Sequence, residues 1–175
     1  RVNNYDGIYV DATPENFLKH IEHAINVIKD KPEEHRILFL KSWNEWGEGN
    51  YVEPDTEFGH GWLDAIKKSK AKRYYICNVM TQPGETDHFS VEDHVDALER
   101  HTFKGIAPEV IVTFNTAEDK LIQRYKESGA YPVNIRQLEH DYRIIYEDLL
   151  DNSMDKIRHD PIKIRALMLK LLKES

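Results

Sequence analysis

The chain has 175 residues, a hydrophobic content of 40% and a formal net charge of −7. This hydrophobic content is sufficient for a buried core, whereas 31 acidic against 24 basic residues, without a polybasic run, argue against nucleic acid or an anionic membrane as the main partner. Because the single cysteine, Cys77, cannot form an internal disulfide and no hydrophobic stretch is long enough to span a bilayer, we expect a cytoplasmic protein.

The N-terminal part of the chain shows short β-type runs and a helical pattern. Gly7–Val10 is a short strand candidate. Thr13 and Pro14 provide the N-cap and the first position of a helix. The consecutive apolar residues of Arg36–Trp43 predict a strand that is buried on both faces, as in a parallel sheet covered by helices.

The pattern then passes through a loop and a helix to a further strand. The loop is Asn44–Phe58, and the helix runs through Trp62 and Ile66. The next strand candidate is Arg73–Met80, which is apolar over most of its length. The short basic segment Lys67–Arg73 is the only stretch with a linker-like composition.

A polar loop, Thr81–Phe89, separates this strand from a capped helix. Ser90, with Asp93 three residues later, has the spacing of a capping box and predicts the start of that helix. Glu109–Phe114 is the strand that follows.

The capping signal recurs nearer the C-terminus. Thr116 with Asp119 predicts another helix start, and Gly129 has the place of a left-handed residue that ends the helix. Two shorter strand candidates follow, at Tyr131–Ile135 and Arg143–Tyr146.

The chain closes on a helix with Asp160 as N-cap and Pro161 at its first position. Helices and strands therefore alternate through most of the length, which is typical of βα units. We expect an α/β fold with about five or six mostly parallel strands.

Two glutamates and two tryptophans follow the first long strand. Glu45 and Glu48 are the residue types that a glycosidase uses as acid and base, and Trp43 and Trp46 offer flat surfaces for sugar stacking. In an α/β fold, ligands bind at the ends of strands. The alternative interpretation is that the tryptophans belong to the core and the glutamates to a solvated loop.

The stretch from about residue 5 to residue 66 resembles the C-terminal end of the glycoside hydrolase family 99-like, or WbsX-like, proteins. The resemblance rests on Trp43-Asn44-Glu45-Trp46-Gly47-Glu48-Gly49 and Tyr51-Val52-Glu53-Pro54-Asp55. It implies the last units of a (β/α)8 barrel linked to polysaccharide assembly, with Glu45 and Glu48 as catalytic pair and with Trp43, Asn44 and Trp46 near the sugar.

The second constellation lies between the strand at Arg73–Met80 and the helix capped by Ser90. Free backbone amides at a helix start favour an anion. The side chains that could bind phosphate, ribose or sugar hydroxyls are Asn78, Thr81, Gln82 and Thr86, with Gly84 in the turn. The alternative is a polar turn with a helix cap. The sequence contains no Gly-rich phosphate fingerprint.

The stretch from about residue 69 to residue 175 is similar to the C-terminal part of the YvcK-type gluconeogenesis factors, relatives of the phospholactate transferase family. Residues 77–87, Asp93-His94-Val95 and Arg100-His101 carry this similarity. It implies a Rossmann-like fold and a nucleotide-sugar ligand of the UDP-N-acetylglucosamine type. The sequence departs from the family's Asn-Gly-Pro-rich turn at Asn115-Thr116-Ala117.

The sequence gives little support to other chemistry. His20 and His23 have one of the spacings of metal ligands on a helix, but surface histidines are the alternative that we favour. Cys77 is expected to be buried and inert. We expect no metal and no cofactor, and the oligomeric state stays open.

The two resemblances meet between Asp64 and Lys70. We therefore expect a barrel-end-like segment at 1–68 and a Rossmann-like segment at 69–175, with one merged α/β body favoured over two domains. The chain starts at Arg1 without a methionine, which suggests a fragment, a processed product or an engineered chain.

Three functional hypotheses follow from these patterns. The favoured one is a folded composite scaffold that has no native activity and no complete active site, and whose larger part derives from a nucleotide-sugar-binding protein. The second hypothesis is that this larger part binds a nucleotide-sugar without catalysis. The third is a carbohydrate-active enzyme that uses Glu45 and Glu48.

Overall fold

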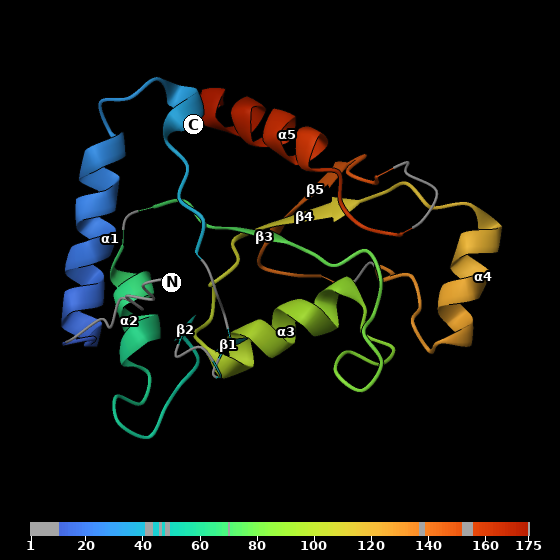
Figure 1. Ribbon diagram of the computed structural model, residues 1–175, viewed down its shortest axis with the longest axis horizontal. Helices are drawn as coiled ribbons and strands as arrows, with labels where there is room; N and C mark the ends of the chain where they lie inside the picture. Colours follow the sequence, from blue (N-terminus) through green and yellow to red (C-terminus); the bar gives the residue numbers. More distant parts are fainter. Residues whose placement is uncertain are drawn as a thin grey trace, which may run out of the picture. The chain divides into compact units, whose positions relative to one another are not determined.

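The computed structural model describes residues 11–40, 44–45, 47, 50–69, 71–136, 139–151 and 156–174. The chain divides into two compact units: unit 1 is Arg1–Asp30 with Ile37–Ala71, and unit 2 is Lys31–Arg36 with Lys72–Ser175. Helices and strands alternate along the chain, so the expected α/β class is confirmed (Figure 1). No helix in the described part of the chain is long and apolar enough to cross a membrane.

Two helices of unit 1, α1 (Pro14–Ile28) and α2 (Gly61–Lys68), pack against each other. As predicted, Thr13 caps α1, because its hydroxyl accepts a first-turn backbone N–H at 3.2 Å, and Pro14 takes the first position. The helices approach closely, since a Cβ added at Gly61 would lie 2.5 Å from Cγ of Pro14. This contact requires glycine at position 61.

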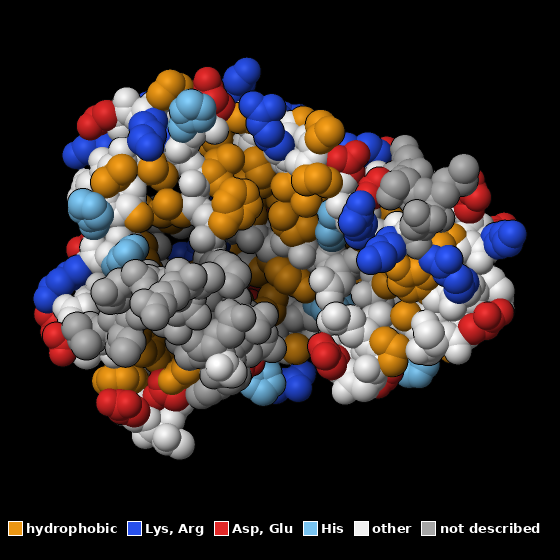
Figure 2. Space-filling view, viewed as in Figure 1, with side chains coloured by type: hydrophobic (Ala, Val, Ile, Leu, Met, Phe, Trp, Pro, Cys, Tyr) orange, Lys and Arg blue, Asp and Glu red, His pale blue; other side chains and the backbone are white. Residues whose placement is uncertain are grey.

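The strand predicted at Arg36–Trp43 is wrong for its described part. Residues 36–40 have no regular secondary structure, and Leu38, Phe39 and Leu40 are 44%, 76% and 50% exposed. An apolar run forms a buried strand only where neighbouring strands pair with it and helices cover it. No described segment pairs with these residues. Figure 2 shows hydrophobic side chains exposed among charged ones on the viewed face of the molecule.

The strands of unit 1 are short. β1 (Asn44–Glu45) and β2 (Asn50–Tyr51) form an antiparallel pair. The other strand expected in this unit, Gly7–Val10, lies outside the described residues.

Unit 2 is built on a parallel sheet. β3 (Tyr74–Ile76), β4 (Glu109–Thr113) and β5 (Arg143–Glu147) lie side by side in that order (Figure 1). All three strands lie where the sequence predicts them, although β3 is shorter than expected.

The number of strands in the described residues, five, agrees with the expected five or six. Three parallel strands and one antiparallel pair form in the described residues, in two separate sheets. Tyr131–Ile135 makes only an isolated bridge, between Met80 and Pro132. Pro132 has no backbone N–H, which disfavours a strand in the interior of a sheet.

Alternate residues of β4 face two different helices. Val110 and Val112 pack against α3 (Val91–His101), whereas Ile111 packs against α5 (Pro161–Lys173). Val110 and Ile111 are both fully buried. The sheet is therefore the middle layer of an α/β/α arrangement, with α3 and α5 on opposite faces (Figure 1).

The predicted starts of α3 and α5 are confirmed. Ser90 Oγ accepts the Asp93 N–H at 3.2 Å, and the Asp93 carboxylate accepts the Ser90 N–H at 2.8 Å, which is a complete capping box. Asp160 caps α5 by accepting the backbone N–H groups of its first turn. The short 3-10 helix η1 (Glu33–His35) contacts α5, which explains why its segment belongs to unit 2.

The predicted cap of the remaining helix, α4 (Asp119–Glu127), is wrong. The residue before this helix is Glu118, and its side chain makes no capping bond. The Asn115 side chain accepts the Thr116 N–H at 2.9 Å. This local bond competes with helix formation and keeps Thr116 outside the helix. Gly129 follows the helix with a φ of 85°, as predicted.

Candidate functional site

The first predicted site falls at the antiparallel pair of unit 1. Asn44 and Glu45 form β1, and their partners in register are Tyr51 and Asn50. In the described residues, no long parallel strand precedes Asn44 and Glu45, which corrects the expected setting. Three residues of the predicted site lie outside the described residues: Trp43, Trp46 and Glu48.

The carboxylate of Asp55 holds together the loop between β2 and α2. It accepts hydrogen bonds from the Trp62 indole N–H at 2.7 Å, the Tyr51 hydroxyl at 3.3 Å and the Glu57 N–H at 2.9 Å. The hydrogen bond from the Phe58 N–H is the largest cause that lowers the pKa of Asp55, and together with these further bonds it outweighs the opposing effect of burial. Asp55 thus fixes β2, which is the strand that pairs with Asn44 and Glu45.

Thr81, in the second predicted site, has a structural role. It is 3% exposed, and its hydroxyl accepts the Tyr131 N–H at 2.9 Å. Its own N–H donates to the Tyr131 carbonyl at 2.7 Å. The Thr81 hydroxyl is directed at the backbone of a neighbouring segment.

The turn after Thr81 satisfies several of its own backbone donors. Gln82 N–H donates to the Thr86 hydroxyl at 2.8 Å, and Gly84 N–H donates to the Asp87 carboxylate at 2.9 Å. Gln82 and Gly84 are exposed, and Thr86 is half-buried. Two donors that the predicted anion site would use are therefore engaged within the turn.

A cavity of about 280 Å³ lies where β3 and β4 end. This is the edge of an open α/β sheet at which ligands bind. No charged side chain lines the cavity among the residues that the structure describes. Its walls include the apolar residues Val79, Met80, Val112, Ile122, Val133 and Ile157.

The polar groups of the cavity follow the two strands. Asn78 comes after β3, and Asn115 and Thr116 come after β4. The Asn115 side chain also donates to Asp148, which contributes to lowering the pKa of that carboxyl after the larger effect of Lys163. Of the described residues predicted to bind a nucleotide-sugar, Asn78 lines the cavity, and Thr81, Gln82, Gly84 and Thr86 do not.

The sequence signal for Asn115 and Thr116 is the same as for Asn78, because all three follow a predicted strand. The cavity is also lined by two aromatic residues, Phe114 and Tyr146. They carry no sequence signal for a site, since aromatic residues are common in strands.

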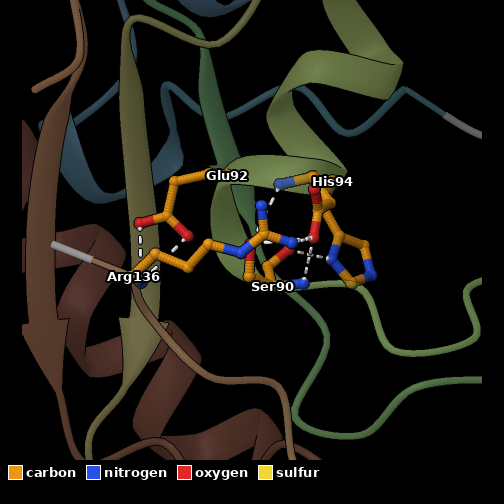
Figure 3. A network of polar contacts seen from close by, with 5 residues as sticks. Ser90, Glu92, His94 and Arg136 are labelled. Atoms are coloured by element: carbon orange, nitrogen blue, oxygen red, sulfur yellow. Dashed lines mark hydrogen bonds and ion pairs between the residues drawn. The ribbon is translucent and has the colours of Figure 1, made fainter. Parts of the chain in front are cut away.

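A polar network fixes the start of α3 (Figure 3). The buried Glu92 carboxylate accepts the Arg136 backbone N–H with both oxygens at 3.1 Å, and the Arg136 guanidinium pairs with Asp93. His94 Nδ1 lies 2.8 Å from the Ser90 carbonyl, so Nδ1 carries the proton. The network joins α3 to the segment that contains Val133 and Ile135.

Cys77 lies under this region and is 2% exposed. Burial raises the pKa of the Cys77 thiol to about 11. Smaller effects lower this pKa, and the largest of them is the hydrogen bond with the Tyr75 hydroxyl. The thiolate, which is the nucleophilic form, is therefore scarce near neutral pH. In the described residues, no group of three or more His, Cys, Asp or Glu side chains is arranged to hold a metal ion.

Comparisons with known families match two different parts of the chain. The family described as 2-phospho-L-lactate transferase CofD matches residues 60–150, and the family described as glycosyltransferase WbsX matches residues 1–66. Both expected resemblances are thus confirmed. The two matches overlap at residues 60–66, close to the predicted junction.

Individual relatives resemble more than half of the chain. The gluconeogenesis factor of Bacillus subtilis is 38% identical over 114 residues, which are 63% of this chain and 36% of the relative. A putative gluconeogenesis factor of Thermotoga maritima is 40% identical over 111 residues, 60% of this chain and 35% of the relative. This chain therefore spans about a third of the length of these relatives.

A solved structure agrees with these matches. The crystal structure of a member of the UPF0052 family from Bacillus halodurans is 32% identical, with a TM-score of 0.56. The similarity covers 62% of this chain and 36% of that one.

Proposed function

Because this chain belongs to the 2-phospho-L-lactate transferase CofD family, we propose that unit 2 binds a nucleotide-sugar of the UDP-N-acetylglucosamine type without converting it. The proposed site is the cavity at the ends of β3 and β4. The larger part of the chain then derives from a nucleotide-sugar-binding protein, and the chain as a whole lacks a complete active site.

The observation that carries this proposal is the position of the cavity. It opens at the carboxyl ends of two adjacent parallel strands, with Asn78 after one strand and Asn115 and Thr116 after the other. Ligands of open α/β sheets bind at this edge. Amide and hydroxyl side chains over an apolar floor are the usual composition of a small-molecule site.

The size of the cavity supports binding without turnover. Sites for small ligands usually have volumes of roughly 300–1,000 Å³, and this one has about 280 Å³. A cavity of this size encloses one part of a nucleotide-sugar and leaves the rest in solvent. In addition, the cavity contains no charged side chain from the described residues that could act as general acid or base.

Calorimetric titration of the 175-residue chain with UDP-N-acetylglucosamine tests this proposal. We expect saturable binding in the micromolar to millimolar range and no change in the ligand after prolonged incubation. Free N-acetylglucosamine is the control. The absence of heat at millimolar UDP-N-acetylglucosamine would remove the proposal, and release of a product would overturn its non-catalytic part.

The proposal includes a composite origin for the chain. The segments are 1–68 and 69–175. Support comes from the change of matching family at residues 60–66 and from the division between Ala71 and Lys72 into two compact units. Limited proteolysis tests the two-segment organisation. We expect first cleavage near residues 67–73, whereas first cleavage within α3 or β4 would contradict it.

A carbohydrate-active enzyme is the second candidate. The match of residues 1–66 to the glycosyltransferase WbsX family supports it, with Glu45 and Glu48 as the catalytic pair and Trp43 and Trp46 as sugar platforms. Turnover of a mannose-type glycoside that is lost in Glu48→Gln would favour this function. A lack of turnover on any glycan would count against it.

A further inference from the structure

The cavity at the ends of β3 and β4 suits a neutral ligand group. No Lys, Arg or His among the described residues lines it, and neither does any acidic residue. A phosphate buried against apolar walls without a cation would lose its hydration without compensation. The part of a nucleotide-sugar that enters this cavity is therefore uncharged.

Asn78 has a side chain with free hydrogen-bonding capacity in the cavity. Its side-chain amide makes no hydrogen bond to any described residue, whereas the Asn115 amide already binds Thr116 and Asp148. An asparagine amide presents a donor and an acceptor side by side. The N–H and C=O edge of a uracil ring is complementary to this pair. Asparagine side chains form the same kind of paired hydrogen bonds with the edges of other bases.

Two aromatic side chains add a stacking surface. Phe114 and Tyr146 line the cavity, yet they are 63% and 51% exposed. They come from the ends of the adjacent strands β4 and β5. Aromatic rings at a site mouth stack on flat heterocycles, and such stacking on a nucleobase contributes about 1–3 kcal/mol.

We propose that this cavity is a nucleobase subsite, in which Asn78 binds the edge of a uracil ring and the exposed aromatic rings cover its face. The diphosphate and the sugar of the ligand then lie outside the cavity. This inference rests on the proposed function and adds which part of the ligand is recognised.

Three ligands separate the base from the rest of the molecule. Calorimetry with the full chain compares UDP-N-acetylglucosamine, uridine and N-acetylglucosamine 1-phosphate. We expect uridine to bind within about threefold of UDP-N-acetylglucosamine, and N-acetylglucosamine 1-phosphate to give no heat. Asn78→Leu should weaken uridine and UDP-N-acetylglucosamine alike by about tenfold or more, the effect of losing the paired hydrogen bonds to the base edge.

Asn134→Leu is the matched control, because Asn134 is an exposed amide between two cavity residues, Val133 and Ile135, but does not line the cavity itself. It should leave both affinities unchanged, and circular dichroism checks that both variants are folded. Tyr146→Ala should weaken uridine binding, and Tyr146→Phe should retain it.

The outcomes distinguish the two claims. If UDP-N-acetylglucosamine binds while uridine does not, or if Asn78→Leu binds both ligands normally, the nucleobase subsite is overturned and the proposed function stands. Binding of uridine alone would support the subsite and overturn the nucleotide-sugar assignment. No binding of either ligand would overturn both.

Discussion

Thr81 and Tyr131 are 50 residues apart in the sequence and exchange two hydrogen bonds. The Thr81 N–H donates to the Tyr131 carbonyl at 2.7 Å, and the Tyr131 N–H donates to the Thr81 hydroxyl at 2.9 Å. This pair ties the segment after β3 to the segment after α4. Both segments contribute walls to the cavity, through Met80 and Pro132.

The first prediction concerns this pair. Thr81→Val should lower the free energy of unfolding by about 1–3 kcal/mol, because the Tyr131 N–H loses its acceptor. Thr81→Ser keeps the hydroxyl and should retain most of the stability. Urea denaturation followed by circular dichroism gives these values. Thr116→Val, at an exposed position, is the control, and equal midpoints for Thr81→Val and Thr116→Val would contradict the prediction.

The second prediction concerns the loss of folding stability at acid pH. Burial would raise the pKa of Asp93, but hydrogen bonds from the Ser90 backbone and hydroxyl, together with Arg136, hold it below its ordinary value. Since a carboxyl of the unfolded chain titrates near pH ~3.9, the unfolded state binds more protons below that pH. The stability from Asp93 is therefore present above pH ~3.9 and is lost as the pH falls towards the pKa of the folded state.

Asp93→Asn should accordingly reduce stability near neutral pH and flatten its decline below pH ~4. Asp96→Asn is the matched control, because Asp96 is exposed and lies on the same helix. Thermal unfolding between pH 3 and pH 7 measures both effects. If stability falls as steeply below pH ~4 in Asp93→Asn as in Asp96→Asn, the capping box is not the source of this pH dependence.

The third prediction concerns His159. This side chain is half-buried, its Nε2 has no hydrogen-bond partner among the described residues, and burial lowers its pKa. The unfolded chain then binds a proton near pH ~6.5 that the folded chain resists. Stability should fall as the pH decreases through this value. His159→Gln should remove that dependence between pH 7 and pH 5, and denaturation curves with an unchanged pH slope would refute it.

The fourth prediction concerns the exposed segment 37–40. Phe39→Ser should leave the free energy of unfolding within about 0.5 kcal/mol of the original value, because Phe39 is 76% exposed. It should also reduce binding of a hydrophobic dye and slow aggregation, since exposed apolar runs promote association. Val27→Ser, on α1, is the control for a single exposed apolar residue. A large loss of stability in Phe39→Ser would mean that the segment is buried in solution.

Local signals predicted much of unit 2. The capping box at Ser90 and Asp93 and the cap at Asp160 each depend on residues within one turn of a helix, so the sequence alone reveals them. The β-branched and aromatic runs that form β4 and β5 are equally local. The α/β class followed from their alternation with helices.

Features that depend on distant partners were not predictable. Residues 37–40 have the composition of a buried strand, but no described segment pairs with them, and composition cannot reveal a missing neighbour. The hydroxyl of Thr81 suggested a ligand contact because nothing in the sequence places Tyr131 next to it. The capping pattern at Thr116 failed for a local reason instead, because the side chain of its neighbour Asn115 accepts the Thr116 N–H.

The location of ligand binding tests the central claim most directly. In an amide-detected NMR titration of the labelled chain with UDP-N-acetylglucosamine, we predict saturable shifts for Asn78, Val79 and Thr116, which line the cavity at the ends of β3 and β4. Shifts confined to residues 82–87 or to residues 44–55, or no shifts at millimolar ligand, would contradict the account.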